Sequence, residues 1–189
     1  MSAAGGYGAT LGADTGNTNL HCFALIAAGG ESGTVSVSLT TNNVAWAQIV
    51  QVRNNTFESW NVANAATGSD STTGAPISVV TGALPWQAGD FALWAFCAPT
   101  DVNAGAQYSA HQISASGIGF SVATEIDEAA SGTGNDVGGF TAWATVTSGS
   151  GTVAATIAAV AATGTNARGP GLVVRMSPTV NQRLAGAFM

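Results

Sequence analysis

An apolar segment between two turn signals, residues 89–99, most constrains what this chain can fold into. It reads Gly-Asp-Phe-Ala-Leu-Trp-Ala-Phe-Cys-Ala-Pro, with a turn indicated by its first two residues and an end at the proline. The uncharged residues between Asp90 and Pro99 are too few for a buried helix and are rich in aromatic side chains. They therefore predict a strand that is covered on both faces. Residues 23–27, Phe-Ala-Leu-Ile-Ala, resemble it, and we expect a buried strand over residues 20–28.

Most other apolar residues occur in short segments that alternate with polar residues and are separated by Gly, Pro and Asn. Such segments predict half-buried strands, for example over residues 44–53 and 57–63, whereas the polar residues 64–75 predict a surface loop. Residues 152–162 are ambiguous, because their alanines favour a helix while the flanking glycines and the Val, Thr and Ile content favour a strand. We expect a strand there.

The spacing of these segments predicts an all-β fold, an antiparallel β-sandwich or jelly roll of about 8–11 short strands. Residues 1–19 have almost no bulky side chain. We expect them to form a flexible N-terminal arm, because they cannot bury enough apolar surface to hold themselves in place. Residues 20–178 are then a single sandwich domain, and residues 179–189 are a C-terminal tail.

Charge is scarce and unevenly placed. Charged residues make up 7% of the chain, and there is no lysine, so the surface has little charge to oppose association and suits a place inside an assembly. Residues 1–136 carry ten acids and one arginine, a formal −9, and residues 137–189 carry three arginines and no acid, a formal +3, which gives the net −6. An acidic chain without a basic cluster argues against nucleic-acid binding.

The two cysteines, Cys22 and Cys97, both lie in apolar segments. They fit small buried hydrophobic residues, and the sequence leaves open whether they form a disulfide. Their spacing does not indicate a zinc site. We expect no secretory signal, because the N-terminal residues have neither a basic start nor an apolar core, and no apolar run approaches the ~18 residues that cross a bilayer.

Catalytic motifs are not evident. His21 and His111 are far apart and no Gly-x-Ser-x-Gly is present, so a nucleophilic triad is not indicated. We predict no enzymatic activity and no cofactor, with one His on a polar face and the other in the core.

The densest acidic group is Glu125, Asp127 and Glu128, with Asp136 close behind. Regular alternation in a strand would place Glu125 and Asp127 on one face, where they could hold Ca²⁺ together with loop carbonyls. The same pair could serve as glycosidase carboxylates. The alternative is a solvated strand end beside a loop, so Glu125, Asp127 and Asp136 are candidate calcium ligands only.

Five tryptophans could stack on sugar rings if they were exposed. Trp94 belongs to the central apolar segment, and Trp46, Trp60 and Trp143 lie in alternating segments, so all four are expected in the core. Trp86 stands between Pro85 and Gln87 and is the candidate for an exposed contact with a glycan.

Two segments carry a resemblance to a known class of proteins. Gly-Asp-Phe-Ala-Leu at 89–93 and Gly-Leu-Val-Val-Arg-Met-Ser-Pro at 171–178, in a chain rich in Ala, Gly, Thr and Ser, resemble the jelly-roll and β-sandwich structural proteins of tailed-bacteriophage virions. The resemblance covers roughly residues 20–178, and no functional residue carries over from it. It implies a head decoration (cement) protein, often a trimer, with a tail or fibre module as the alternative.

The expected function is therefore binding to the outer face of a phage head, with the major capsid protein and further copies of this chain as partners. Localisation would be the capsid surface of a virion assembled in the host cytoplasm, with neither nucleic acid nor membrane as a partner. Residues 1–19 and the three arginines Arg168, Arg175 and Arg183 are the expected capsid contacts. The alternatives are a tail, fibre or receptor-binding component that touches glycan through Trp86, and a free carbohydrate-binding module.

Overall fold

The computed structural model of this chain describes residues 2–3, 8–15, 18–24, 34, 36–38, 46–53, 59–72, 76–99, 107–130, 137–162 and 168–179. These described residues contain thirteen strands and no helix, and the fold is an all-β sandwich, as the sequence predicted. Three of the strands, β1, β4 and β9, have only 2 residues each. The ten longer strands agree with the expected number.

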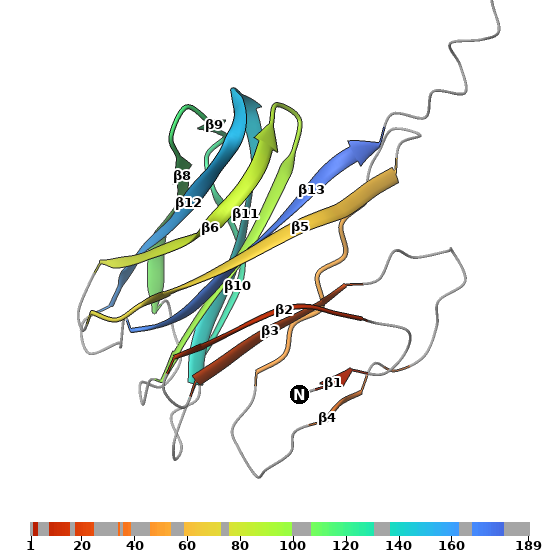
Figure 1. The fold of residues 1–189 in the computed structure, drawn as a ribbon. Helices are drawn as coiled ribbons and strands as arrows, with labels where there is room; N and C mark the ends of the chain where they lie inside the picture. Colours follow the sequence, from red (N-terminus) through yellow and green to blue (C-terminus); the bar gives the residue numbers. More distant parts are fainter. Residues whose placement is uncertain are drawn as a thin grey trace, which may run out of the picture.

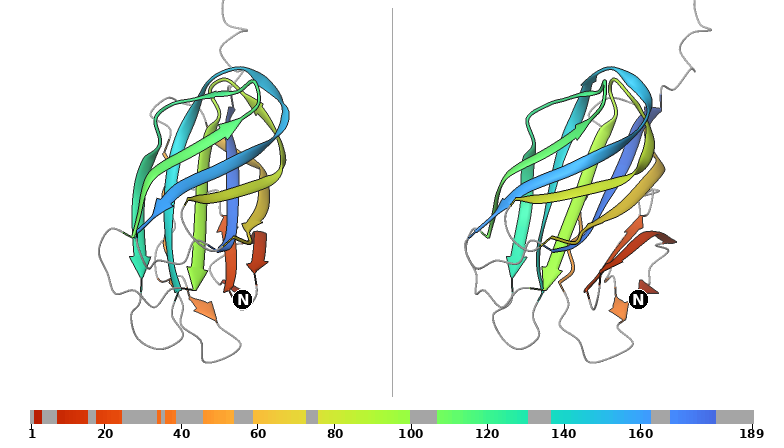
Figure 2. Two further views of the ribbon diagram at one scale, coloured as in Figure 1. Left: turned by 90° about the vertical axis from the view of Figure 1, so that its left-hand side faces the viewer. Right: turned by 60° about the vertical axis from the view of Figure 1, so that its left-hand side comes forward.

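Two antiparallel sheets pack face to face (Figures 1 and 2). The strand order of the larger sheet is β10-β11-β7-β13-β5, and β9 also pairs with β11. Its strands are β5 (Ser59–Asp70), β7 (Phe91–Pro99), β9 (Gly119–Phe120), β10 (Thr124–Ala130), β11 (Val137–Ser148) and β13 (Gly169–Thr179). The smaller sheet has the order β6-β12-β8, with β6 (Ile77–Gln87), β8 (Tyr108–Ala115) and β12 (Ser150–Ala161).

Two further strand pairs lie outside these sheets. Strands β2 (Gly8–Thr15) and β3 (Thr18–Ala24) form an antiparallel hairpin, and β1 (Ser2–Ala3) pairs with β4 (Val37–Ser38). The hairpin packs against β5, β13 and β7 of the larger sheet (Figure 1). The predicted boundary between arm and domain after residue 19 therefore falls inside β3. The flexibility of residues 1–19 stays a prediction.

Strand β7 is central, as its apolar sequence predicted. It pairs with β11 on one side and β13 on the other. Alternate residues point to opposite faces of a strand, and Trp94 and Phe96 point into the space between the two sheets, where both are 0% exposed. On the other face, Phe91 and Leu93 pack against a second apolar cluster. Both faces of β7 are covered, which confirms the prediction.

The main core lies between the two sheets and is built around aromatic rings. Phe96, Tyr108 and Phe140 form a mutually packed group, with ring centroids 5.2–5.9 Å apart. Each large side chain fully buried there stabilises the fold by about 1.5–3 kcal/mol from the hydrophobic effect. The largest fully buried apolar and aromatic side chains are those of Trp86, Trp94, Tyr108, Phe96, Phe140, Ile77, Ile157, Val79 and Val173.

A second, smaller core lies on the outer face of the larger sheet. Strand β13 contributes Leu172, Val174 and Met176, and β3 contributes Leu20 and Cys22. Strand β13 is thus buried on both faces, because Val173 on its opposite face enters the main core. The hairpin adds a partial third layer to the sandwich.

Two expected elements differ from the structure. Strand β5 runs through residues 64–70, which were predicted to be loop, because they pair along β13 from Asn64↔Arg175 to Asp70↔Gly169. Pairing with a strongly apolar strand outweighs the low strand propensity of these small polar residues. Conversely, residues 46–53, within the predicted strand 44–53, belong to no strand. The ambiguous segment 152–162 is a strand, β12, as expected.

Candidate functional site

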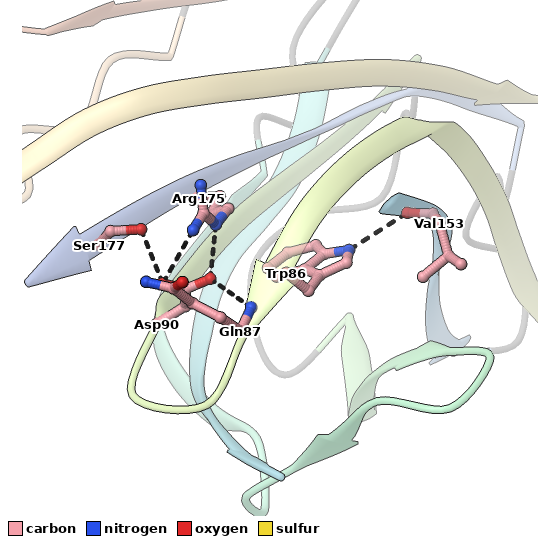
Figure 3. A network of polar contacts seen from close by, with 6 residues as sticks. All are labelled: Trp86, Gln87, Asp90, Val153, Arg175 and Ser177. Carbon is pink, nitrogen blue, oxygen red and sulfur yellow. Dashed lines mark hydrogen bonds and ion pairs between the residues drawn. The ribbon is translucent and has the colours of Figure 1, made fainter. Parts of the chain in front are cut away.

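The connection between β6 and β7 carries a buried ion pair (Figure 3). The Asp90 carboxylate is 0% exposed and accepts hydrogen bonds from Arg175 Nε at 2.5 Å and Arg175 Nη2 at 3.2 Å. It also accepts from Ser177 Oγ at 2.7 Å and the Gln87 backbone N–H at 2.8 Å. Gly89, with φ of +91°, closes the turn that the sequence predicted at this position. Each of the two carboxylate oxygens therefore accepts two hydrogen bonds from groups of the protein.

The burial of Arg175 corrects one predicted contact. Arg175 lies on β13 and is 7% exposed, because the buried carboxylate of Asp90 requires a cation beside it. Its guanidinium therefore does not face a capsid. Arg168 is exposed just before β13, and Arg183 lies outside the described residues, so these two remain the predicted arginine contacts.

The prediction that Trp86 is an exposed glycan contact is wrong. Trp86 lies in β6, is 2% exposed, and donates from Nε1 to the carbonyl oxygen of Val153 at 3.2 Å (Figure 3). Its ring meets Phe120 edge to face with centroids 5.3 Å apart. The neighbouring Pro85 indicated a turn, yet β6 continues through it opposite Thr152 and carries the indole into the core.

The predicted pair of acids does not share a face. The pairing of β10 with β11 shifts between Glu125 and Asp127, so that Glu125 lies opposite Ala142 and Asp127 opposite Thr141. Directly opposite residues share a face and consecutive residues do not, so the two carboxylates point to opposite faces of the sheet. Asp136 lies outside the described residues. Among the described residues, no group of three or more His, Cys, Asp or Glu side chains is placed to hold a metal ion.

The acids of β10 instead connect the edges of the two sheets. Glu128 accepts hydrogen bonds from the backbone N–H groups of Gln107 at 2.7 Å and Tyr108 at 3.0 Å, where β8 begins. Glu125 Oε2 lies 3.0 Å from His111 Nε2. A charged edge strand also resists pairing with another chain. These side chains have a structural role that the sequence reasoning missed, because only the tertiary structure brings β8 beside β10.

Tyr108 is fully buried in the main core, and His111 is partly buried beside it. The His111 ring lies 4.4 Å from the Phe140 ring between centroids, and its side chain is 6% exposed. Burial raises the pKa of the Tyr108 hydroxyl, with smaller contributions from Cys97 and Glu128. His111 is thus the core histidine of the expected pair, although its Nε2 reaches the rim.

Both cysteines are free. Cys97 is buried, and desolvation raises the pKa of its thiol to about 12; burial also raises the pKa of Cys22. A thiol acts as a nucleophile through its thiolate, so neither group is activated at neutral pH.

A groove lies beside β8 and the segment that follows β9. Its volume is about 330 Å³, it is open to solvent, and no charged side chain lines it. Phe120, Ile113 and Ile118 give it an apolar part, and Gln112, Ser114 and Ser121 give it neutral polar groups. This chemistry suits a neutral ligand with hydroxyl groups and an apolar ring face.

The outer face of the β6–β12–β8 sheet is uncharged along all three strands. In the left view of Figure 2 these strands lie in front of the larger sheet and present this face. Val80 is 60% and Val160 is 45% exposed on it. The exposed or half-exposed residues of this face are Ser78, Val80, Ala83, Pro85, Ser109, Gln112, Ser114, Thr152, Ala154, Thr156, Ala158 and Val160. Neither residues 77–87 nor residues 150–161 contain a charged residue. The sequence alone therefore indicates that the outer face of these two strands is uncharged.

No helix in the described part of the chain is long and apolar enough to span a bilayer. Comparison with protein-family models, with curated proteins and with solved structures finds no match to this chain.

Proposed function

We propose that this chain is a virion structural protein, a capsid decoration protein that binds the outer face of a phage head and stabilises it. The observation that carries the proposal is the uncharged outer face of the β6–β12–β8 sheet, in a chain with 7% charged residues and no lysine. A free soluble protein is normally kept apart from its neighbours by surface charge. A protein that functions among permanent neighbours does not need that charge.

The polar groups of the described residues also support a role without catalysis. The carboxylates of Asp90 and Glu128 are occupied by hydrogen bonds that connect strands. Cys97 is protonated at neutral pH because burial raises its pKa to about 12. A general base or nucleophile must be able to reach a substrate proton or carbon. Asp90 and Cys97 are buried, and both oxygens of Glu128 are occupied by backbone N–H groups.

The proposed partners are the major capsid protein and further copies of this chain. Arg168 and Arg183 remain the candidate contacts to an acidic capsid surface, together with residues 1–7. Residues 8–19 are left out of this set because they contribute β2 and the start of β3, which pack against β5, β7 and β13 of the larger sheet.

The test is co-sedimentation of the purified chain with heads assembled from the major capsid protein of the same phage. We expect saturable binding, and we expect Arg168→Gln combined with Arg183→Gln to weaken it at least tenfold at a temperature where circular dichroism shows both chains folded. Arg53→Gln, which removes one positive charge at an exposed position elsewhere, is the matched control for each single change, Arg168→Gln or Arg183→Gln. Heads that sediment without the wild-type chain would overturn the proposal.

The groove beside β8 favours a second candidate function, recognition of a host carbohydrate by a tail, fibre or receptor-binding component. Gln112 and Ser114 offer neutral hydrogen-bonding groups next to the Phe120 ring, a combination that suits sugars. Binding on a glycan array that is lost in Gln112→Ala and kept in Gln87→Ala, an exposed glutamine outside the groove, would support it. An array without signal would exclude it for the sugars tested.

A further inference from the structure

The β6–β12–β8 outer face has no charged side chain, although the chain carries a formal charge of −6. We propose that this face binds the same face of a second copy of this chain. The inference rests on the proposed function and deepens it, because it assigns a surface to the contact between copies, with a two-fold contact in place of the trimer that the resemblance implies.

The shape of the face suits sheet-on-sheet packing. Its side chains are small, mainly Ala, Ser, Thr and Val, so that two copies could approach to the ~10 Å spacing of stacked sheets. Val80 and Val160, exposed by 60% and 45%, would lose contact with water. The hydroxyl of Thr156 and the amide of Gln112 can form hydrogen bonds across the contact.

Electrostatics favours a second copy over a charged partner. The acids Glu125, Asp127 and Glu128 lie on β10, in the other sheet, and none of the three strands β6, β12 and β8 brings a charged side chain of its outer face to the contact. An acidic or basic partner would find no complementary charge on this face. Two identical copies related by a two-fold axis present the same patch to each other, and two neutral faces satisfy that condition without repulsion.

The area of the face sets the expected affinity. Strand β12 has 12 residues, and three strands of that order cover roughly 500 Å² at 3.3 Å per residue and 4.8 Å between strands. Two copies would bury about 1,000 Å² in total, which is the lower limit for a specific interface. We therefore expect a weak contact with a dissociation constant between about 1 μM and 1 mM, which would gain strength from the many copies on a particle.

The experiment is sedimentation equilibrium of the full chain over a hundredfold concentration range, without capsid. We expect reversible dimerisation of the wild type, weakened at least tenfold in both Val80→Lys and Val160→Lys. Either lysine lowers the net negative charge and so reduces general repulsion between copies, which means that weaker association must come from the face itself. Thr147→Lys, at an exposed position of the larger sheet, carries the same charge and should dimerise at least as well as wild type.

A mixing experiment tests that the contact is between like faces. Val80→Lys and Val80→Glu should each associate at least tenfold more weakly than wild type when alone. They should associate more strongly when mixed, because the two faces then carry opposite charges instead of like charges. A wild type that stays monomeric at about 1 mM, or lysine variants that dimerise like Thr147→Lys, would overturn the inference. Neither result concerns head binding, which is measured separately with the arginine variants. Unchanged melting temperatures establish that all variants are folded.

Discussion

Two carboxylate sites join the two sheets, and they differ in how completely water is excluded. Asp90, between β6 and β7, is 0% exposed and paired with Arg175. The second site lies on the edge strand β10. Glu128 is half-buried and accepts hydrogen bonds from two backbone N–H groups at the start of β8. Glu125 is exposed and contacts His111 of β8. A buried charge is costly unless it is paired, whereas a rim charge keeps part of its hydration. The same residue chemistry should therefore contribute very different amounts to stability.

The largest effect is expected at the buried pair. Asp90→Ala leaves the Arg175 guanidinium buried without a counter-ion, and should lower the free energy of unfolding by about 3–5 kcal/mol. Urea denaturation followed by tryptophan fluorescence measures it. Asp90→Ala combined with Arg175→Met should be much less destabilised than the sum of the single variants, because it removes both charges. Additive effects would show that the pair is not coupled.

The hydrogen bonds of Glu128 to the start of β8 should contribute less to stability than the Asp90–Arg175 pair. Glu128→Gln removes the negative charge and replaces one of the two acceptor oxygens for the N–H groups of Gln107 and Tyr108 with an amide nitrogen, and we expect a loss of about 1–2 kcal/mol. Hydrogen exchange of these two amides should accelerate in the variant while the amides of β7 stay protected. A loss as large as that of Asp90→Ala would remove the distinction between the two sites.

Glu125→Gln should have a smaller effect still. The carboxylate side chain is 38% exposed, and exposed pairs contribute about 0–1 kcal/mol. We expect a change in unfolding free energy below about 1 kcal/mol at low salt, and less at about 1 M salt, where exposed charges are screened. Asp127→Gln, on the opposite face of the same strand, is the control and should show no salt-dependent loss.

Cys97 differs from both carboxylate sites, because it is a buried ionisable group that stays uncharged. Its pKa is raised from 9.0 to about 12 by burial, so the folded state binds the thiol proton more tightly than the unfolded chain does. Stability from this group is complete below pH 9 and is lost as the pH rises from about 9 to about 12. Cys97→Ala should show a shallower decline of unfolding free energy over that range, and a decline identical to wild type would contradict the assignment. At neutral pH, thiol reagents should label Cys22, which is half-buried, before Cys97.

The sequence predicted the parts of the fold whose apolar pattern is continuous and strong. The segment from Phe91 to Ala98 has no charge and many aromatics, and a central strand is the one place where both of its faces can be covered. The segment 152–162 is the strand β12, as its Thr, Val and Ile content and the flanking glycines predict.

Errors arose where long-range contacts decide the outcome. Residues 64–70 are strand only because β13 lies beside them, and Gly68 fits there because a Cβ atom would come within 2.0 Å of the Val80 carbonyl oxygen. The burial of Arg175 depends on Asp90, which is 85 residues away in sequence. The register shift at Ile126 that separates Glu125 from Asp127 follows from pairing with β11. None of these partners can be identified from local pattern.

The position of β13 has a consequence for how the chain folds during synthesis. This strand, residues 169–179, lies between β5 and β7, so a nascent chain that ends before residue 169 holds β5 and β7 with an empty row between them. The larger sheet closes only after β13 has left the ribosome, and the many long-range pairings predict slow folding. Until then the edge of β7 that pairs with β13 is open to other nascent chains, and a chaperone that shields this edge would raise the yield of folded protein.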